Sequence, residues 1–389
     1  MKTILFIHQS AELYGSDKTL LFLAKSIGQY GIRAIVVLPE KGPLADLIRK
    51  KDIKLIINPV IKVSRSSISF FNLFKLPFQI LFFLYTINKK LGKEKIDIVH
   101  SNTLAVLGGA IFAKWKHIRH IWHIHEIIEK PRFINKLYRF LVNSLSYKVV
   151  FNSKASLISL VKQSDELNAK SQVIYNGIEK IDKIYSSQEI NDFRTKQMKF
   201  PADAIIVGMA GRISRWKGQL LLLNAYEKLQ KEIPNLYLII IGSPPPDQGK
   251  YLFNLKTEII FKALENHVRI IPFTTEIWKY WSGIDIAVVP SIEPEPFGLV
   301  AIEAMLIKKP VIAAGHGGLL EIIEHKENGL LFEPNNLNDL YASLKLLAEN
   351  ESLRTFLGTN GNLFVSQEFT IDKYVHNFVK LYQNIMDNV

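Results

Sequence analysis

No cysteine occurs among the 389 residues of the chain. Its absence excludes disulfide scaffolds, thiolate zinc sites and cysteine nucleophiles together. The N-terminus also lacks a long hydrophobic run, because the apolar stretch Met1–His8 is short and no small-residue cleavage site follows it. We interpret this stretch as a first β-strand. Hydrophobic residues make up 48% and charged residues 22% of the chain, a mixture typical of globular proteins that argues against extended disorder.

Acidic residues are scarce in the first half of the chain. Residues 1–180 contain 28 lysines and arginines against 12 aspartates and glutamates, whereas residues 181–389 contain 21 against 24. The whole net charge of +13 therefore comes from the first half. Such a surface attracts nucleic acid, anionic lipid or phosphorylated small molecules, and charge alone does not choose among them.

Apolar segments rich in isoleucine and valine alternate with amphipathic stretches in two successive series. This rhythm predicts two doubly wound α/β domains, each with a parallel sheet covered on both faces. We expect an N-terminal domain over 1–185, a polar linker over 186–203 and a second domain over 204–368. The predicted strands are Thr3–His8, Ala34–Leu38, Lys54–Ile57, Asp97–Ser101, His120–Ile124, Lys148–Phe151 and Gln172–Tyr175, and then Ala204–Ala210, Leu236–Ile241, Val268–Pro272, Asp285–Pro290, Val311–Ala314 and Gly329–Phe332.

The segment Ser69–Ile87 is unusually apolar. It is broken by Asn72, Lys75 and Pro77, so it does not make a convincing membrane-spanning helix. Two interpretations stay open: a helix packed on the sheet, or an interfacial helix that dips into an anionic leaflet.

The most informative stretch runs from Pro290 to Met305. A predicted strand leads into a proline-rich loop that holds Glu295, a helix is expected to start near Phe297, and Glu303 lies about two turns beyond that start. In this arrangement the two carboxylates can accept hydrogen bonds from sugar hydroxyls, and the free N–H groups of the helix N-terminus can bind phosphate. A carboxylate on a largely buried helix, such as Glu303, also needs a partner.

A second constellation, Gly211–Gly218, directly follows a predicted strand. Arg212 and Lys217 lie five residues apart where the strand ends and a helix opens. Two cations and backbone amides at this point can bind a diphosphate. They would neutralise a departing nucleotide.

A histidine-rich strand supplies a third constellation. Alternation places His123 and His125 on one face of the strand His120–Ile124 and its extension, and Glu126 lies where the strand should end. Ligands collect at such strand ends in open α/β sheets. A metal site is the weaker interpretation, since no Asp-x-Asp motif occurs in the chain.

The first strand is followed by a turn that contains Gly15. A glycine near a helix start lets the backbone approach a ligand, while Ser16 or Asp17 can cap the helix. The turn lacks Gly-x-Gly-x-x-Gly, which argues against a dinucleotide-dependent oxidoreductase.

The motif Glu-Pro-Phe-Gly-Leu-Val-Ala-Ile-Glu-Ala-Met, from Glu295 to Met305, resembles the signature of retaining glycosyltransferases of family 4. The other motifs agree with it in order and spacing, and the resemblance covers nearly the whole chain. It implies the GT-B fold, with a cleft between the two domains and a C-terminal helix, here within 369–389, that crosses back to the first domain.

The resemblance implies a reaction that moves a sugar from a nucleotide diphosphate to an acceptor hydroxyl, with no metal and no cofactor beyond the nucleotide sugar. It favours His125 over His123 as the ring beside the reacting sugar, with Gly15, His123 and Glu126 on the acceptor side. From the basic first half we expect a lipid-linked or growing envelope glycan as the acceptor and an anionic membrane surface as a partner. We also expect a cytoplasmic, peripheral location. Residues assigned to the donor or to catalysis are Gly15, His125, Arg212, Lys217, Glu295, Phe297, Gly298, Leu299 and Glu303.

Two rivals stay open. One is another GT-B enzyme, such as a sugar-nucleotide epimerase, against which the Glu295–Glu303 motif speaks. The other is a non-catalytic protein that binds nucleotide sugars or nucleic acid through its charge. We expect no nucleic-acid partner, because the chain shows no recognisable nucleic-acid module or aromatic stacking platform.

Overall fold

The structure is a computed structural model that describes residues 1–387 apart from 63–69, 129–130, 163, 180 and 182. The chain divides into two compact units. Unit 1 comprises Met1–Gly177 and Ile371–Val389, and unit 2 comprises Ile178–Thr370.

Unit 1 is built on a parallel sheet whose described strands follow the order β3-β2-β1-β4-β5-β6-β7. Strand order reverses between β1 and β4, which makes this pair the topological switch point of the sheet. Each predicted strand of the first series is present, within a few residues of its expected bounds. The strands are β1 Lys2–His8, β2 Ile32–Leu38, β3 Lys54–Ile57, β4 Ile98–Asn102, β5 Arg119–Ile124, β6 Lys148–Phe151 and β7 Ser171–Val173.

Alternate strand residues of unit 1 point into two cores on opposite faces of the sheet. Phe6 and Val36 pack with the helices of one face, while Ile7 and Val37 pack with those of the other. The first face carries α1 Gly15–Ser26, α2 Pro43–Lys50 and α15 Ile371–Asp387. The second carries α3 Phe70–Leu91, α4 Leu107–Lys116, α5 Arg132–Leu145, α6 Lys154–Val161 and α7 Asp165–Ala169.

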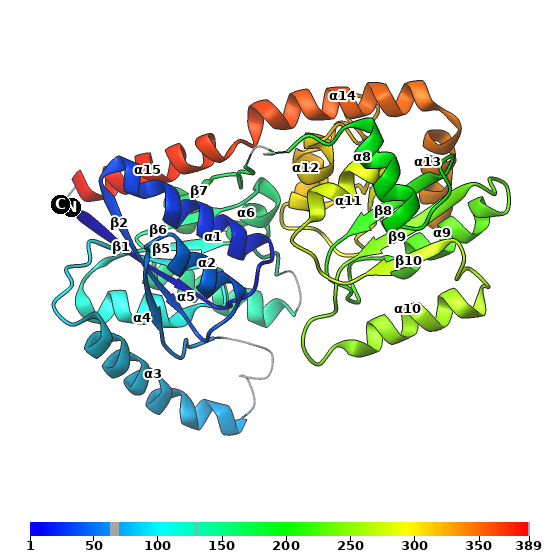
Figure 1. Cartoon of the computed structure of the whole chain (residues 1–389). Helices are drawn as coiled ribbons and strands as arrows, with labels where there is room; N and C mark the ends of the chain where they lie inside the picture. Colours follow the sequence, from blue (N-terminus) through cyan, green and yellow to red (C-terminus); the bar gives the residue numbers. More distant parts are fainter. Residues whose placement is uncertain (63–69, 129–130, 163, 180, 182, 388–389) are drawn as a thin grey trace. The chain divides into compact units, whose positions relative to one another are not determined.

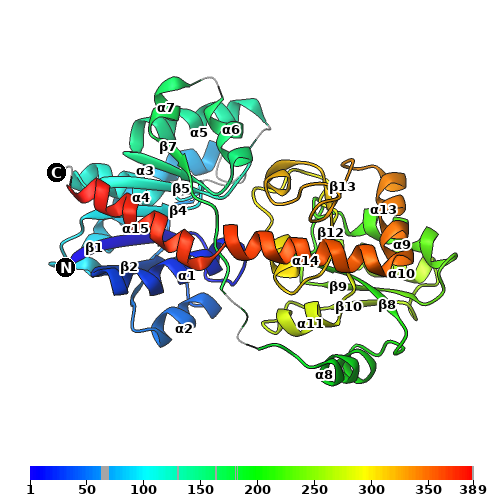
Figure 2. The same cartoon turned by 90° about the horizontal axis from the view of Figure 1, so that it is seen from above.

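The C-terminal helix completes unit 1, as the family resemblance implied. The buried residues Tyr374, Phe378 and Tyr382 of α15 belong to the same core cluster as β1 and α1. Figures 1 and 2 both show α15 beside α1. Its strong amphipathicity explains this return, since one face of the helix has to be covered.

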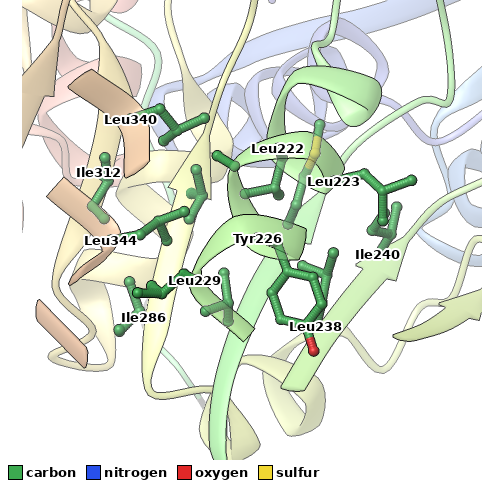
Figure 3. Close-up of a cluster of buried hydrophobic side chains, with 14 of the residues drawn as sticks. Leu222, Leu223, Tyr226, Leu229, Leu238, Ile240, Ile286, Ile312, Leu340 and Leu344 are labelled. Carbon is green, nitrogen blue, oxygen red and sulfur yellow. The ribbon is translucent and has the colours of Figure 1, made fainter. Parts of the chain in front are cut away.

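Unit 2 repeats the architecture with the strand order β10-β9-β8-β11-β12-β13, again parallel and with its switch point between β8 and β11. Figure 3 shows one core face, where α9 packs Leu222 and Tyr226 against strand residues such as Leu238. The predicted doubly wound fold is therefore confirmed in both units. The strands are β8 Ile205–Ala210, β9 Leu236–Ile241, β10 Val268–Ile271, β11 Ile286–Val289, β12 Val311–Ala314 and β13 Leu330–Phe332, and the helices are α8 Ser187–Asp192, α9 Gln219–Gln230, α10 Gly249–Phe261, α11 Ile277–Gly283, α12 Leu299–Leu306, α13 Leu337–Glu349 and α14 Glu351–Glu368.

The segment 186–203, expected to be a linker, is folded within unit 2 and the unit boundary lies at Gly177. This segment contains α8 and a π-helical turn, Phe193–Gln197. Phe193 is buried with its ring 5.0 Å from that of Tyr280, and Arg194 pairs with Asp285 at 2.9 Å. A buried aromatic and a sheltered ion pair tie the segment to the domain, which polar composition alone did not indicate.

The apolar segment Ser69–Ile87 lies mostly in α3, although Ser69 and the side chains of 70–74 are outside the described part of the chain. Phe83 and Ile87 are buried in the core of unit 1, as expected of a packed helix. Phe78 and Phe82 on the same helix are 75% and 58% exposed, as expected of an interfacial one. Among the described residues, no helix has the length and apolar character needed to cross a bilayer.

Candidate active site

The geometry of the parallel sheet brings two candidate loops of unit 2 together. The loop 211–218 follows β8, and the loop 290–298 follows β11, its neighbour across the switch point. The Ile292 N–H donates to the Trp216 carbonyl at 2.8 Å, which joins the loops directly. Ligands of open α/β sheets bind at such a junction.

Lys217 and Glu295 meet at the centre of this junction. The Lys217 Nζ lies 2.6 Å from the Glu295 Oε1, and their side chains are only 14% and 6% exposed. The Ser291 hydroxyl donates to the same oxygen at 2.5 Å. Charge-assisted hydrogen bonds in a sheltered position are short and strong, so the Glu295 carboxylate is firmly placed. Lys217 also lies 4.2 Å from the centroid of the Trp216 ring.

A glycine-rich turn that contains Gly317 and Gly318 packs against the main chain of Glu295. The Gly318 N–H donates to the Glu295 carbonyl at 2.7 Å, and a Cβ on Gly317 would lie 2.4 Å from that carbonyl oxygen. His316 contributes as well, because its Nε2 lies 2.9 Å from the Ser291 carbonyl. The segment 315–318 thus positions the candidate carboxylate.

The helix after this loop begins later than expected. Gly298, with φ of +119°, is the N-cap of α12, which starts at Leu299 rather than near Phe297. Glu303 therefore lies about one turn, not two, beyond the first helical residue. Phe297 is buried with its ring 5.5 Å from that of Phe369, so its side chain packs inside unit 2. Leu299 is half-buried.

Glu303 is 7% exposed and has the partner that its burial demands. The indole N–H of the fully buried Trp281, on α11, points to the Glu303 Oε2 at 3.4 Å. Arg212, in the loop after β8, is exposed, and its main-chain carbonyl accepts a hydrogen bond from the Gln219 side chain at 2.9 Å. Of the four charged candidates of unit 2, Lys217 and Glu295 are in direct contact, Arg212 lies in the loop after β8, and Glu303 lies on the helix that follows the loop of Glu295.

In unit 1, His123 and His125 share a face of β5 and its extension, with ring centroids 4.0 Å apart. His123 has no exposed surface and packs against Phe378 of α15. A ligand can reach only the partly exposed His125, so the placing of His123 beside an acceptor is wrong. Burial lowers the pKa of His125 to about 3, with the neighbouring His8 lowering it further and Asp17 acting in the opposite direction.

Glu126 has a structural use. Its Oε2 accepts the backbone N–H groups of Leu104 and His125, both at 2.9 Å, and burial raises the pKa of the carboxyl group. It thereby joins the ends of β4 and β5. Gly15 is the first residue of α1, preceded by Tyr14 as N-cap, so its backbone stands at a helix N-terminus as the sequence indicated.

Several residues in these sites were missed by sequence reasoning. Ser291 and Trp281 hold the two carboxylates of unit 2, and His8 and Asn102 lie beside His125 in unit 1. Ser291, His8 and Asn102 each come at or just after the carboxyl end of a strand. That common position was the signal available in the sequence, whereas nothing in the sequence paired Trp281 with Glu303.

No group of three or more His, Asp or Glu side chains arranged to hold a metal ion occurs in the described part of the chain.

Comparison with known proteins gives a consistent assignment. Residues 191–364 match the family of glycosyl transferases group 1, and residues 15–180 match glycosyltransferase family 4. An uncharacterized glycosyltransferase of Methanocaldococcus jannaschii is 30% identical over 318 residues, which cover 78% of this chain and 81% of that protein. The capsular polysaccharide biosynthesis glycosyltransferase CapM of Staphylococcus aureus is 26% identical over 46% of each chain.

Among solved structures, Anabaena HepE in complex with UDP and glucose is 26% identical, with a TM-score of 0.84 over 98% of this chain and 99% of that one. HepE has also been determined with UDP-glucose. Two Rossmann-like units in one chain, as found here, are the architecture of the GT-B class. Within that class, the chain belongs to the family 4 glycosyltransferases.

Proposed function

We propose that the protein transfers a hexose from a nucleotide-diphosphate sugar to an acceptor hydroxyl with retention of configuration, without a metal ion or other cofactor. The observation that carries the proposal is the sheltered group Lys217, Glu295 and Ser291, formed by the two loops at the switch point of unit 2. The bound UDP and UDP-glucose of Anabaena HepE support a uridine nucleotide as the donor.

Each charged group has a task in this scheme. Arg212 and Lys217 bind the diphosphate, which carries its negative charge throughout and gains more as the sugar leaves. Glu295 orients the sugar by accepting hydrogen bonds from its hydroxyls, and Glu303 accepts from the ribose. Lys217 is paired with Glu295, so diphosphate binding has to share or break that ion pair.

The transfer needs no separate general base. The bond between the anomeric carbon and the diphosphate oxygen breaks, the acceptor oxygen bonds to that carbon on the same face, and the acceptor proton passes to the departing diphosphate oxygen. Arg212 and Lys217 stabilise the charge that this diphosphate develops.

A thermal-shift screen over uridine, guanosine, adenosine and thymidine diphosphates and their hexose conjugates tests the donor site. We expect a uridine nucleotide to raise the Tm of the wild type but not of Lys217→Ala. Lys231→Ala is the matched control, because Lys231 is an exposed lysine of unit 2 that pairs with Glu227. Equal shifts in all three proteins would show that the nucleotide binds elsewhere.

We also propose that the acceptor is a lipid-linked or growing glycan of the bacterial envelope and that unit 1 works on the cytoplasmic membrane surface. The α3–α4–α5 layer exposes apolar side chains among lysines: Phe78, Leu81, Phe82, Tyr85, Trp115, Phe133, Leu137 and Phe140, with Lys75, Lys89, Lys90, Lys114, Lys116 and Lys136. Aromatic residues flanked by lysine are typical of surfaces that meet anionic lipid. CapM acts in capsular polysaccharide biosynthesis, which supports the pathway.

Sedimentation with liposomes tests the membrane surface. We expect binding to vesicles that contain phosphatidylglycerol at low salt, weaker binding at high salt and none to neutral vesicles. Phe133→Ser with Phe140→Ser should weaken binding, while Phe253→Ser, at a 70% exposed position of unit 2, should not. The same retention for all variants would contradict this surface.

A further inference from the structure

A chain of polar side chains lies at the switch point of the unit 1 sheet. His8 ends β1, Asn102 ends the neighbouring β4, and Asp17 is in the first turn of α1. All three are at most 2% exposed. The last member of this row of side chains is His125, which lies just beyond β5 and has a partly exposed ring. Burying this many polar groups costs free energy, because each has to be desolvated, so a functional reason for the arrangement is expected.

The first link is the contact between Asp17 and His8. The Asp17 Oδ1 lies 2.5 Å from the His8 Nε2, and the other carboxylate oxygen accepts the Tyr14 N–H at 2.8 Å. A carboxylate can only accept when ionised, so His8 carries a proton on Nε2. Hydrogen bonds to His8 and Tyr14 outweigh burial and lower the pKa of Asp17, which keeps it ionised.

The second link fixes which way the Asn102 amide faces. Its Nδ2 lies 3.2 Å from the Ser16 carbonyl oxygen, which can only accept, and 3.1 Å from the His8 Nδ1. The His8 Nδ1 also lies 3.0 Å from the Asn102 main-chain carbonyl oxygen, so the amide is fixed by the Ser16 carbonyl, toward which its nitrogen faces. The amide oxygen faces the other way, 3.0 Å from the His125 Nε2.

We propose that Asp17, His8 and Asn102 are positioning residues that hold His125 with its proton on Nε2, so that an unprotonated Nδ1 faces the ligand. The inference deepens the proposed function, in which the ligand is a sugar whose hydroxyl donates to Nδ1. An amide oxygen can only accept, so His125 has to donate to Asn102 from Nε2. Fixing a histidine tautomer through the hydrogen bond at its other nitrogen is a general device of functional sites.

The groups around His125 agree with a neutral ring. His8 and His123 face it from β1 and β5, Asp17 faces it from α1, and Glu126 is engaged with two backbone N–H groups. Among the described acidic residues, Asp17 raises the pKa of His125, but it does not offset the lowering by burial. The ring thus serves as a hydrogen-bond acceptor rather than as a cation.

Long-range proton–nitrogen NMR on protein labelled with ¹⁵N-histidine tests the tautomer without any substrate. His125→Gln assigns the signals. We expect the His125 ring to show a protonated Nε2 and an unprotonated Nδ1 at every pH between 6 and 8. A proton on Nδ1, an imidazolium or a mixture of tautomers would overturn the inference, whatever the activity of the enzyme.

Asn102→Asp supplies a second readout. It puts a carboxylate against the His125 Nε2, so the pKa of His125 should rise and its signals should titrate above pH 5. Asn58→Asp is the matched control, since Asn58 is a fully buried asparagine after β3 that does not contact His125. We expect Asn102→Asp to lower kcat about tenfold with unchanged donor affinity, and to make kcat depend on pH. If the Asn102→Asp protein folds and the titration of His125 is unaltered, the proposal that Asn102 positions His125 is refuted. If His125 has the expected tautomer but the enzyme turns over no nucleotide sugar, the proposed function is refuted instead.

Discussion

Lowering the pH from 7 to 5 should destabilise unit 1 far more than unit 2. Burial lowers the pKa of His120 to about 3 and those of His100 and His123 well below their usual value. These rings stay neutral in the folded protein but gain a proton on unfolding once the pH falls below about 6.5. The unfolded state then binds more protons, so the free energy of unfolding falls with pH.

The size of the effect follows from these pKa values. With a pKa of about 6.5 unfolded and about 3 folded, His120 alone removes about 2 kcal/mol between pH 7 and 5. His100 and His123 act in the same direction. Glu126 opposes them, because its raised pKa lets the folded state take up a proton first. A domain of ordinary stability, about 5–15 kcal/mol, would lose a large part of it.

Hydrogen exchange resolved by peptide, corrected for the intrinsic effect of pH, measures the two units separately. We expect the free energy of exchange to fall steeply in β1, β4, β5 and α15, and much less in β8, β9 and β11. His123→Leu should reduce the fall in unit 1, because both nitrogens of that ring lack a hydrogen-bond partner among the described residues and no bond is lost. His267→Leu, in unit 2, is the control. Equal losses in both units would refute the reasoning.

Three further predictions concern unit 2. Gly298→Ala should lower the free energy of unfolding by about 1–2 kcal/mol, because φ is +119° and the new Cβ would lie 2.7 Å from the Leu319 side chain. The control is Gly249→Ala, where open space surrounds the new Cβ and no such loss is expected. Thermal denaturation compares the two variants. Trp281→Phe removes the N–H that faces Glu303, so steady-state kinetics should show a several-fold higher KM for the donor with little change in kcat, and an unchanged KM would contradict the ribose assignment. Phe193→Ala should cost about 3–5 kcal/mol in chemical denaturation if 186–203 belongs to the domain core; a loss below 1 kcal/mol would return the segment to the status of a linker.

Much of the fold followed from the sequence because buried parallel strands are continuous apolar runs. The runs before His8 and after Ala204 predicted β1 and β8 directly, whereas the return of the C-terminal helix to the first domain was implied by the family resemblance. The prediction of a linker at 186–203 was wrong because one aromatic residue and one ion pair attach this segment to unit 2, and neither is visible in its polar composition.

The candidate site was predictable where residue type and strand end coincided. Lys217 and Glu295 are 78 residues apart in sequence and meet because β8 and β11 are neighbours. Which of His123 and His125 is exposed could not be predicted, because it depends on how Phe378 of α15 covers β5. The partnership of Trp281 with Glu303 likewise comes from the packing of α11 on α12.

The most direct test of the account is release of nucleotide from UDP-glucose by the purified protein, with and without added acceptor. The account predicts slow release by the wild type, faster release with an acceptor glycan, and loss of both in Lys217→Ala but not in Lys231→Ala. Release that is the same in wild type and Lys217→Ala would contradict the assignment of the Lys217–Glu295 site to sugar transfer.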